Sequence, residues 1–252
     1  MPQLFKPSAN SAAKVSLLLT AALPVLLISV GSGISRSAAN TGVGNRLDQP
    51  VPFSHQHHAW ELGIDCRYCH TSVEESGYAG LPDTETCMTC HSQIWTNSPL
   101  LDPVRKSYET GQPLEWNLVN KVPEFVYFNH SIHIDRGISC NNCHGPVQKM
   151  HLTFKGQPFH MVWCLECHRE PEKYLYVDEK NPQLTPRQQV FNLYVKFQSD
   201  PEGTNMSPRE RALINGKEQV TTVKDLIERG RKLLEERGIN KTQLADCSVC
   251  HH

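Results

Sequence analysis

The sequence contains five copies of a short pattern, Cys-x-x-Cys-His, whose side chains can hold a cofactor covalently. The copies begin at Cys66, Cys87, Cys140, Cys164 and Cys247. Two thiols at this spacing can each form a thioether with a vinyl group of a porphyrin, and the adjacent histidine can then bind the iron. All 10 cysteines of the chain fall in these motifs. The sequence therefore predicts five covalently bound haem c groups.

Each motif supplies two thioether cysteines and one proximal iron ligand. The predicted thioether pairs are Cys66 with Cys69, Cys87 with Cys90, Cys140 with Cys143, Cys164 with Cys167, and Cys247 with Cys250. The predicted proximal ligands are His70, His91, His144, His168 and His251. The chemistry expected of such sites is electron transfer, so no side chain is assigned a catalytic role.

Paired cysteines also match the spacing of a four-cysteine zinc site, which is an alternative to haem. Five pairs would leave one pair unmatched, and a zinc ribbon has no use for a histidine after every second cysteine. Cysteines three positions apart also pair poorly with each other in disulfides. The pattern therefore favours haem over zinc or disulfides.

A second pattern, Phe-x-His-x-x-His, precedes each pair of attachment motifs. It places His55 and His58 before the first two motifs, and His130 and His133 before the next two. Histidines three positions apart lie on one face of a helical turn. An iron that already has a proximal histidine has one axial position free, so the two cannot serve the same haem. We therefore expect each pair to supply the distal ligands of two neighbouring haems.

One distal position lacks an obvious donor. The candidates between the third and fourth motifs are Met150, His151, His160 and Met161. His57 and His252 are also available. A methionine ligand would raise the reduction potential of that haem above those with two histidines, although methionine otherwise fills gaps in cores. The sequence leaves the choice between methionine and histidine open.

The rest of the chain is expected to be mainly α-helical with extensive loops, wrapped around the haems. Its 17 prolines and 15 glycines favour loops, and helices are expected at 100–109, 207–215 and 222–237. Residues 171–204 are polar and carry no haem motif, so we interpret them as an excursion over the domain or a partner-docking segment. The formal net charge of −1 gives no support for nucleic-acid binding.

An uncharged apolar stretch near the N-terminus is long enough to span a bilayer. The predicted transmembrane helix covers residues 15–35, and Lys6 and Lys14 before it favour a cytoplasmic N-terminus. Covalent haem attachment separately implies a haem domain in the periplasm or another extracytoplasmic space. A signal peptide cleaved near Ser37-Ala38-Ala39 is the alternative. We expect the retained, single-pass anchor.

These features divide the chain into six segments. Residues 1–14 form the cytoplasmic N-terminus, 15–35 the transmembrane helix and 36–51 a tether. The haem-binding part then comprises a first dihaem module with its linker, a second dihaem module, and a C-terminal extension that carries the fifth haem. Their expected bounds are 52–127, 128–172 and 173–252.

Residues 52–172 resemble the pentahaem cytochrome c subunit of bacterial alternative complex III. The resemblance rests on the segments PFSHQHH, GIDCRYCHTSVE, TCMTCHSQIW, FVYFNHSIH, ISCNNCHG and MVWCLECHREPE. The motif order more distantly resembles class III multihaem cytochromes c. The resemblance implies a membrane complex that oxidises quinol and passes electrons to a periplasmic cytochrome c or cupredoxin. The implied partners are polytopic quinol-binding subunits, an iron-sulfur subunit and a monohaem cytochrome c.

Two other functions are the alternatives. A stand-alone quinol dehydrogenase, anchored by one helix, would feed a periplasmic reductase directly. A catalytic multihaem reductase would need an iron with an open axial site, often marked by an unusual proximal residue, whereas all five motifs here have histidine. The expected role is therefore outer-sphere electron transfer, in which the protein fixes haem spacing and reduction potentials.

Overall fold

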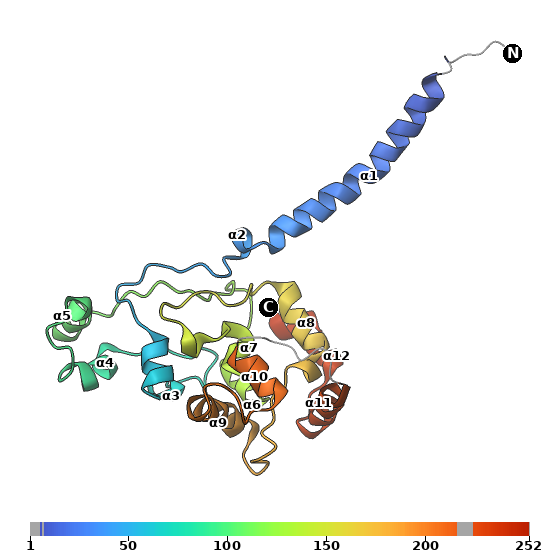
Figure 1. Ribbon diagram of the computed structural model, residues 1–252. Helices are drawn as coiled ribbons and strands as arrows, with labels where there is room; N and C mark the ends of the chain where they lie inside the picture. The colour runs from blue at the N-terminus through green and yellow to red at the C-terminus, as the bar shows by residue number, and fades with distance from the viewer. Residues whose placement is uncertain (1–5, 7, 216–223, 252) are drawn as a thin grey trace. The chain divides into compact units, whose positions relative to one another are not determined.

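The computed structural model describes residues 6, 8–215 and 224–251, and the chain divides into two compact units (Figure 1). The first unit, Met1–Gly42, holds helix α1 (Ser8–Arg36) and the short helix α2 (Ala38–Thr41). Helix α1 has 29 residues and contains the predicted span 15–35. At about 1.5 Å per residue it exceeds the roughly 30 Å hydrocarbon core of a bilayer. Its length and composition fit a membrane anchor and a signal sequence alike.

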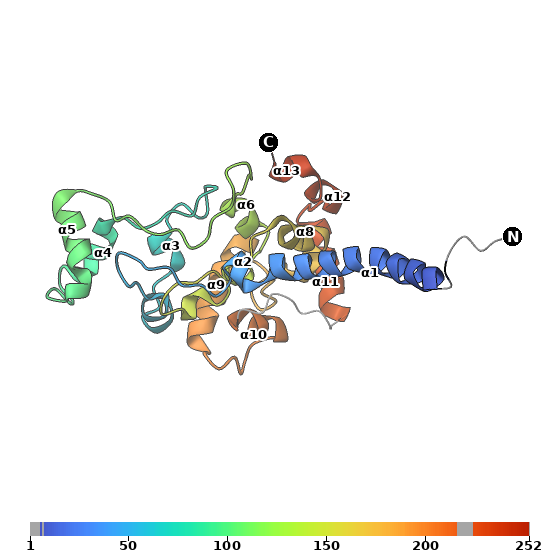
Figure 2. The same cartoon turned by 90° about the horizontal axis from the view of Figure 1, so that it is seen from above.

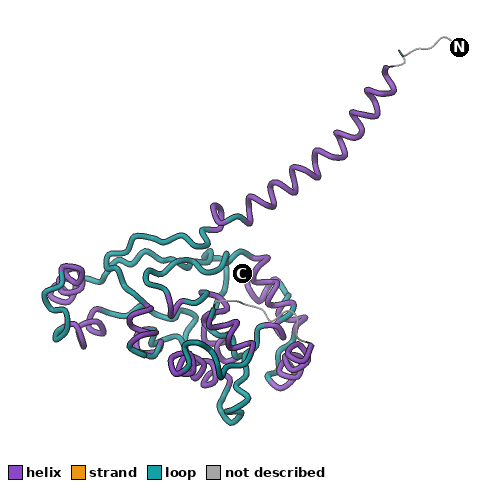
Figure 3. Tube along the Cα trace, viewed as in Figure 1, coloured by secondary structure: helices purple, strands orange, loops and turns teal. Residues whose placement is uncertain are grey.

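The second unit, Val43–His252, consists of short helices and long loops. Its described residues contain no strand (Figure 3) and only two isolated antiparallel bridges, Arg46 with Phe154 and Val126 with His251. The mainly helical, loop-rich fold expected from the sequence is therefore confirmed. The helical elements are η1 (Gln56–Glu61), α3 (Cys66–Cys69), α4 (Thr84–His91), η2 (Pro99–Leu101), α5 (Asp102–Thr110), α6 (His130–Asp135), α7 (Cys140–His144), η3 (Val147–Lys149), α8 (Met161–Arg169), η4 (Pro171–Lys173), α9 (Pro186–Ser199), α10 (Pro208–Ile214), α11 (Lys224–Glu236), α12 (Lys241–Leu244) and α13 (Cys247–Cys250).

Three of the cysteine motifs form helical turns that begin at their first cysteine, because a capping residue precedes each one. Asp65 before α3 accepts a hydrogen bond from the amide of Arg67, and Asp246 before α13 accepts one from the amide of Ser248. Ser139 before α7 forms a capping box with Asn142. A helical turn places residues three apart on one face, so both cysteines of a motif can reach the edge of one porphyrin.

Residues 171–204 form part of the core, in contrast to the excursion expected from the sequence. They contain α9, which begins with Pro186 and is capped by a box between Thr185 and Gln188. The helix buries an apolar stripe whose members are fully or almost fully inaccessible, namely Val190, Leu193 and Phe197. Polar residues between these positions mask the 3–4 spacing in the sequence, so the composition of the stretch indicates a loop although its periodicity fits a helix.

The other three expected helices are present in the described residues. The 100–109 prediction corresponds to η2 and α5, and the 207–215 prediction to α10, which Ser207 and Glu210 cap. The 222–237 prediction corresponds to α11, with residues 222 and 223 outside the described part of the chain. Helix α11 lies so close to η4 that a Cβ at Gly230 would overlap the carbonyl oxygen of Glu172. Glycine is therefore required at this contact.

A buried ionic cluster joins α9 to α10. The ammonium of Lys196 lies 2.6 Å from Asp178 and 3.0 Å from Glu210, and Tyr176 donates a hydrogen bond to Glu210. The side chain of Asp178 is only 1% exposed. Burial alone would raise the pKa of Asp178, but hydrogen bonds from Lys196, Asn181 and Asn192 outweigh it and hold that pKa below its ordinary value. The cluster therefore stabilises the fold only while its carboxylates are ionised.

Replacing the cation of this cluster will destabilise the protein. Lys196→Met leaves two buried carboxylates without their partner, so we expect the free energy of unfolding at pH 7 to fall by about 3 to 5 kcal/mol. Denaturant unfolding of the detergent-solubilised full chain measures it. The control is Lys232→Met, because Lys232 pairs with Glu236 on the surface at 3.7 Å, and such pairs contribute about 1 kcal/mol or less.

The difference in free energy of unfolding between the wild type and Lys196→Met is expected to depend on pH. The sign of this dependence follows from the lowered pKa values of the Asp178 and Glu210 carboxyl groups. A lowered folded-state pKa gives stability that is present above the unfolded-state value and is lost as pH falls through the folded-state value. The difference between the wild type and Lys196→Met is therefore expected to shrink in acid. An equal difference at neutral and acidic pH would contradict the ionic role of the cluster.

Candidate haem sites

Four predicted distal histidines lie opposite four predicted proximal histidines. The ring centres are 6.4 Å apart for His55 and His70, 6.2 Å for His58 and His91, 6.3 Å for His130 and His144, and 6.2 Å for His133 and His168. A metal-bound imidazole nitrogen lies about 2 Å from the metal, with the ring centre roughly 1 Å further. Two imidazoles on opposite sides of one ion therefore have centres about 6 Å apart. All four spacings fit a haem iron between the rings.

Each Phe-x-His-x-x-His segment reaches two different sites, and its phenylalanine orients both imidazoles. Phe53 stacks on His58 with ring centres 4.4 Å apart and meets the ring of His55 edge-on at 5.0 Å. The second module repeats this arrangement. Phe128 stacks on His133 at 4.8 Å and meets His130 edge-on at 4.7 Å. In both modules the phenylalanine therefore contacts one imidazole edge-on and the other by stacking.

Backbone carbonyls fix the tautomer of most of these histidines. A carbonyl oxygen only accepts, so Nδ1 must carry the proton and Nε2 keeps the lone pair that a metal needs. The Nδ1 donors and their acceptors are His58 to Ser54 (2.9 Å), His70 to Gly80 (2.7 Å), His91 to Ile94 (3.2 Å), His130 to Gly77 (2.8 Å), His133 to Asn129 (2.7 Å) and His168 to Leu244 (3.0 Å). The acceptors at Gly77, Gly80, Ile94 and Leu244 are backbone carbonyls of apolar residues, so the sequence gives no pattern that predicts them.

Burial keeps several of these imidazoles neutral. Burial, and then the neighbouring histidines, lower the pKa of His55 and of His144 to about 4 in each case. Burial also lowers the pKa values of His58, His130 and His133. A metal competes with a proton for the same nitrogen, so a neutral imidazole is the form that binds iron.

The first and second modules support each other's predicted distal histidines. Nδ1 of His55 in the first module lies 3.0 Å from the hydroxyl of Thr153 in the second, while His130 in the second bonds to Gly77 in the first. Gly77 permits this contact because a Cβ there would lie 3.0 Å from the carbonyl oxygen of Phe128. Thr153 is a functional contact that the sequence analysis missed, since 98 residues separate it from His55.

The surroundings of the motifs also fit covalent haem. All 10 cysteines are described and none of them forms a disulfide. In residues 6, 8–215 and 224–251 no three His, Cys, Asp or Glu side chains gather to hold a bare ion, so the zinc alternative has no counterpart there.

The buried amide nitrogen of Asn142, between the two cysteines of the third motif, has no hydrogen-bond partner. Apolar side chains next to the motifs that a porphyrin would cover are exposed, notably Ile94, Trp95, Phe125, Ile132 and Met161.

We number the sites 1 to 5 by the order of their motifs in the sequence. Sites 2 and 1 meet where the hydroxyl of Tyr68 lies 2.8 Å from that of Thr89. Sites 1 and 3 meet where Cys66 and Cys140 pack against the same core cluster. Burial, and then the neighbouring Cys140 thiol, raise the pKa of Cys66. The first module and the second module therefore meet at sites 1 and 3.

The series continues through the second module to the C-terminal extension. Sites 3 and 4 share α6, which carries His130 and His133. Sites 4 and 5 meet where His168 donates to the carbonyl of Leu244, just before the fifth motif. The motifs therefore follow one another in space in the order 2, 1, 3, 4, 5. Helices α4 and α12 accordingly lie at opposite ends of the second unit (Figures 1 and 2).

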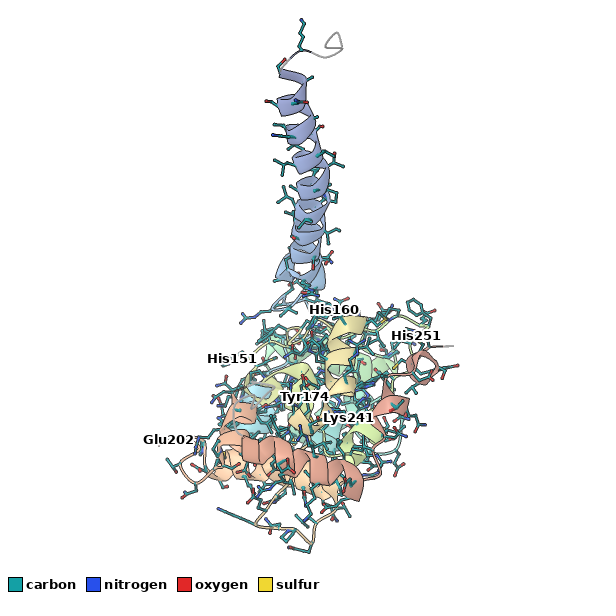
Figure 4. All side chains as sticks on the ribbon, turned by 90° about the vertical axis from the view of Figure 1, so that its right-hand side faces the viewer. His151, His160, Tyr174, Glu202, Lys241 and His251 are labelled. Atoms are coloured by element: carbon teal, nitrogen blue, oxygen red, sulfur yellow. The ribbon has the colours of Figure 1, made fainter. Side chains whose placement is uncertain are left out.

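Site 5 differs from the others in what faces its proximal histidine. Phe125 stacks on His251 with ring centres 5.8 Å apart, and Tyr127 donates its amide proton to the carbonyl of Cys250. Figure 4 shows His151 far from His251 across the same face of the unit. His160 accepts a hydrogen bond at Nδ1 from the amide of Trp163, so Nε2 of the neutral ring carries the proton. That tautomer does not suit iron binding through Nε2.

The two methionine candidates have opposite environments. Met150 is 3% exposed, whereas Met161 is 60% exposed. Met161 begins α8 and lies one turn before Cys164, and residues three apart share a helix face. Met161 and Cys164 therefore share one face of α8. Burial, and then the neighbouring Cys250, raise the pKa of Cys164. His252 lies outside the described residues.

Comparison with known proteins agrees with this geometry. Residues 33–102 match the class III cytochrome c family, and residues 109–231 match the cytochrome c552 family. The chain is also 35% identical over 101 residues to the multihaem cytochrome c subunit of menaquinone reductase from Nitratidesulfovibrio vulgaris. That match covers 40% of this chain and 47% of the relative, so the chain spans about half of that protein's length. The two segments that hold the first four motifs are therefore similar to multihaem c-type cytochromes.

Proposed function

We propose that this chain is a membrane-anchored pentahaem cytochrome c that transfers electrons between a quinone-reactive membrane complex and a periplasmic partner. The observation that carries the proposal is the set of four opposed histidine pairs, spaced for haem iron and arranged in an unbroken series. Haem supplies reversible one-electron chemistry when it is bound. The chain's own residues hold the irons at fixed separations and set their potentials through ligand type and burial.

The proposed ligand set follows from the motifs and the geometry. The ten cysteines form the thioethers, and the motif histidines bind the irons on the proximal side. The distal ligands are His55 for site 1, His58 for site 2, His130 for site 3 and His133 for site 4. We assign Met161 to site 5, because Met150 is buried, His151 lies elsewhere and His160 has the unsuitable tautomer.

The direction of electron flow has two candidates. In the first, partners like those of alternative complex III oxidise quinol: polytopic quinol-binding subunits, an iron-sulfur subunit and a monohaem cytochrome c. Electrons then leave to a periplasmic cytochrome c or cupredoxin. In the second, electrons enter from a periplasmic donor and reach a quinone. The name of the relative states that the complex to which that protein belongs reduces menaquinone. The resemblance across residues 52–172 favours the first candidate.

A retained helix α1 is part of the proposal, with its N-terminus in the cytoplasm and the haem domain in the periplasm. The helix carries Lys14 near its first turn and Arg36 at its end, and it is apolar between them. Intact-mass measurement of the membrane-extracted protein is expected to give the uncleaved chain plus five haems. A chain that begins near Asn40 would show that the helix is a signal peptide.

The experiment that tests the function is a native gel of mildly solubilised membranes, stained for haem and analysed by mass spectrometry. Co-migration with polytopic membrane subunits and an iron-sulfur protein is expected. Adding quinol to the excised complex then separates the two directions, because a quinol-oxidising complex reduces its haems and passes electrons on to an added periplasmic acceptor. A band that contains this chain alone would favour the stand-alone quinol dehydrogenase.

Removing one distal histidine will open one iron. His58→Ala is expected to let the reduced protein bind one carbon monoxide per chain, because the iron of site 2 loses its sixth ligand. The matched control is His57→Ala. His57 is the adjacent histidine, but its side chain is 48% exposed and pairs with Glu61 instead of facing a proximal histidine. Carbon monoxide binding to both variants, or to neither, would contradict the assignment.

Met161→Leu tests the ligand at site 5. A methionine-to-iron charge-transfer band in the near infrared is expected in the oxidised protein and should disappear in this variant, together with a drop in the highest haem potential. Met150→Leu is the control, because it makes the same chemical change at a buried position. Loss of the band in Met150→Leu instead would move the assignment to Met150.

A further inference from the structure

Helix α9 presents a stripe of side chains that contacts both dihaem modules. The stripe consists of Arg187, Phe191, Tyr194 and Gln198, whose spacing of four, three and four places them on one face of the helix. It lies beside the apolar stripe that fills the core. The sequence gives this part of the C-terminal extension no haem motif, and the proposed function assigns it no task.

Two members of the stripe hold the first module. The guanidinium of Arg67, inside the first haem motif, lies 4.3 Å above the centre of the Phe191 ring, a cation–π distance. Gln198 donates a hydrogen bond of 2.8 Å from its side-chain amide to the carbonyl oxygen of Ala59 in η1. Helix η1 belongs to the segment that carries His55 and His58, so α9 contacts both the attachment motif and the distal segment.

Tyr194 holds the second module. Its hydroxyl donates to the side-chain oxygen of Asn141 at 3.1 Å and accepts the amide proton of Asn141 at 3.2 Å. Asn141 lies inside the third haem motif and is 1% exposed. Its side-chain nitrogen donates to the carbonyl of Leu213 in α10 at 2.8 Å. All three contacts are buried, so the hydroxyl of Tyr194 has no water with which to replace its partner.

Arg187 spans both modules by itself. Its Nε lies 2.5 Å from a carboxylate oxygen of Asp135 in the second module and 3.9 Å from one of Glu74 in the first. Both carboxylates are partly exposed, so this contact is weaker than the buried one at Tyr194. It stands at the opposite end of the stripe from Gln198. The stripe therefore crosses the junction along its whole length.

The junction under the stripe is the meeting point of sites 1 and 3. Cys66 and Cys140, one thioether residue from each site, pack against the core cluster that contains Tyr194 and Phe191. Burial, and then the two thiols, raise the pKa of the Tyr194 hydroxyl far above its ordinary value. The side chain is therefore a neutral phenol that packs against both attachment sites. A shift of this ring would change the position of one site relative to the other.

We propose that α9 fixes the separation of sites 1 and 3, with Tyr194 as its principal positioning residue. The proposal rests on the proposed function in that both sites carry haem. In the order 2, 1, 3, 4, 5 the two modules adjoin at sites 1 and 3, and α9 contacts both sides of this junction. The coupling between haems of opposite modules therefore depends on a helix that binds no haem itself.

Tyr194→Phe is the test, because it removes only the hydroxyl that holds Asn141. The expected result is a change in the magnetic interaction between the site 1 and site 3 irons, seen in the electron paramagnetic resonance spectrum of the oxidised protein. The potentials of these two haems are expected to shift in a spectroelectrochemical titration. Haem content and the optical spectrum of six-coordinate haem should stay as in the wild type.

Tyr176→Phe is the matched control. It removes a similarly buried hydroxyl, which donates a hydrogen bond of 2.8 Å to Glu210, a residue outside the haem motifs. Arg187→Gln is the second variant, because its partly exposed site tolerates the change even if Tyr194→Phe folds poorly. We expect it to change the same magnetic interaction in the same direction, by a smaller amount.

The outcomes separate this inference from the proposed function. Suppose that both α9 variants carry five haems by mass and keep the wild-type magnetic interaction between sites 1 and 3. That result would overturn the proposed role of α9 and leave the proposed function standing. The same change in Tyr176→Phe would also overturn the role of α9, because the effect would then be one of general stability. A purified wild-type protein without covalent haem would overturn the proposed function itself.

Discussion

The structure depends on one geometric requirement, that two imidazoles lie opposite each other with their ring centres about 6 Å apart. Four pairs meet it, at 6.2 to 6.4 Å. The rest of the second unit serves this requirement. Caps start the motif helices at their cysteines, phenylalanines orient the distal rings, and backbone carbonyls fix the tautomers. Few regular elements are needed, because each constraint acts over one helical turn.

The sequence predicts what is local and repeated. The attachment motifs, the pairing of His55 with His58 and of His130 with His133, and the capped helix at Ser207 all involve residues within a few positions of one another. The structure places each of these four histidines opposite one motif histidine. The contact between His55 and Thr153 could not be predicted, since it joins residues 98 positions apart through a fold-back of the second module.

Helix α9 is an element whose role could not be predicted from local sequence patterns. Its capping box at Thr185 is a local signal that the sequence analysis did not use, and polar residues around Val190 and Leu193 gave the segment the composition of a loop. Its partners, Arg67 and Asn141, lie in two different haem motifs, so its role is set by tertiary packing alone. The order of the five sites has the same origin, because sites 1 and 2 exchange places relative to the sequence.

The position of α9 late in the chain has a consequence for assembly. Folding buries Cys66 and Cys140 and raises the pKa values of both thiols, and a protonated thiol is a poor nucleophile. With haem attached as proposed, thioether formation at these cysteines would be easiest before the helix docks. The four upstream motifs also precede α9 in the chain, so they are synthesised before the helix that covers the junction between sites 1 and 3.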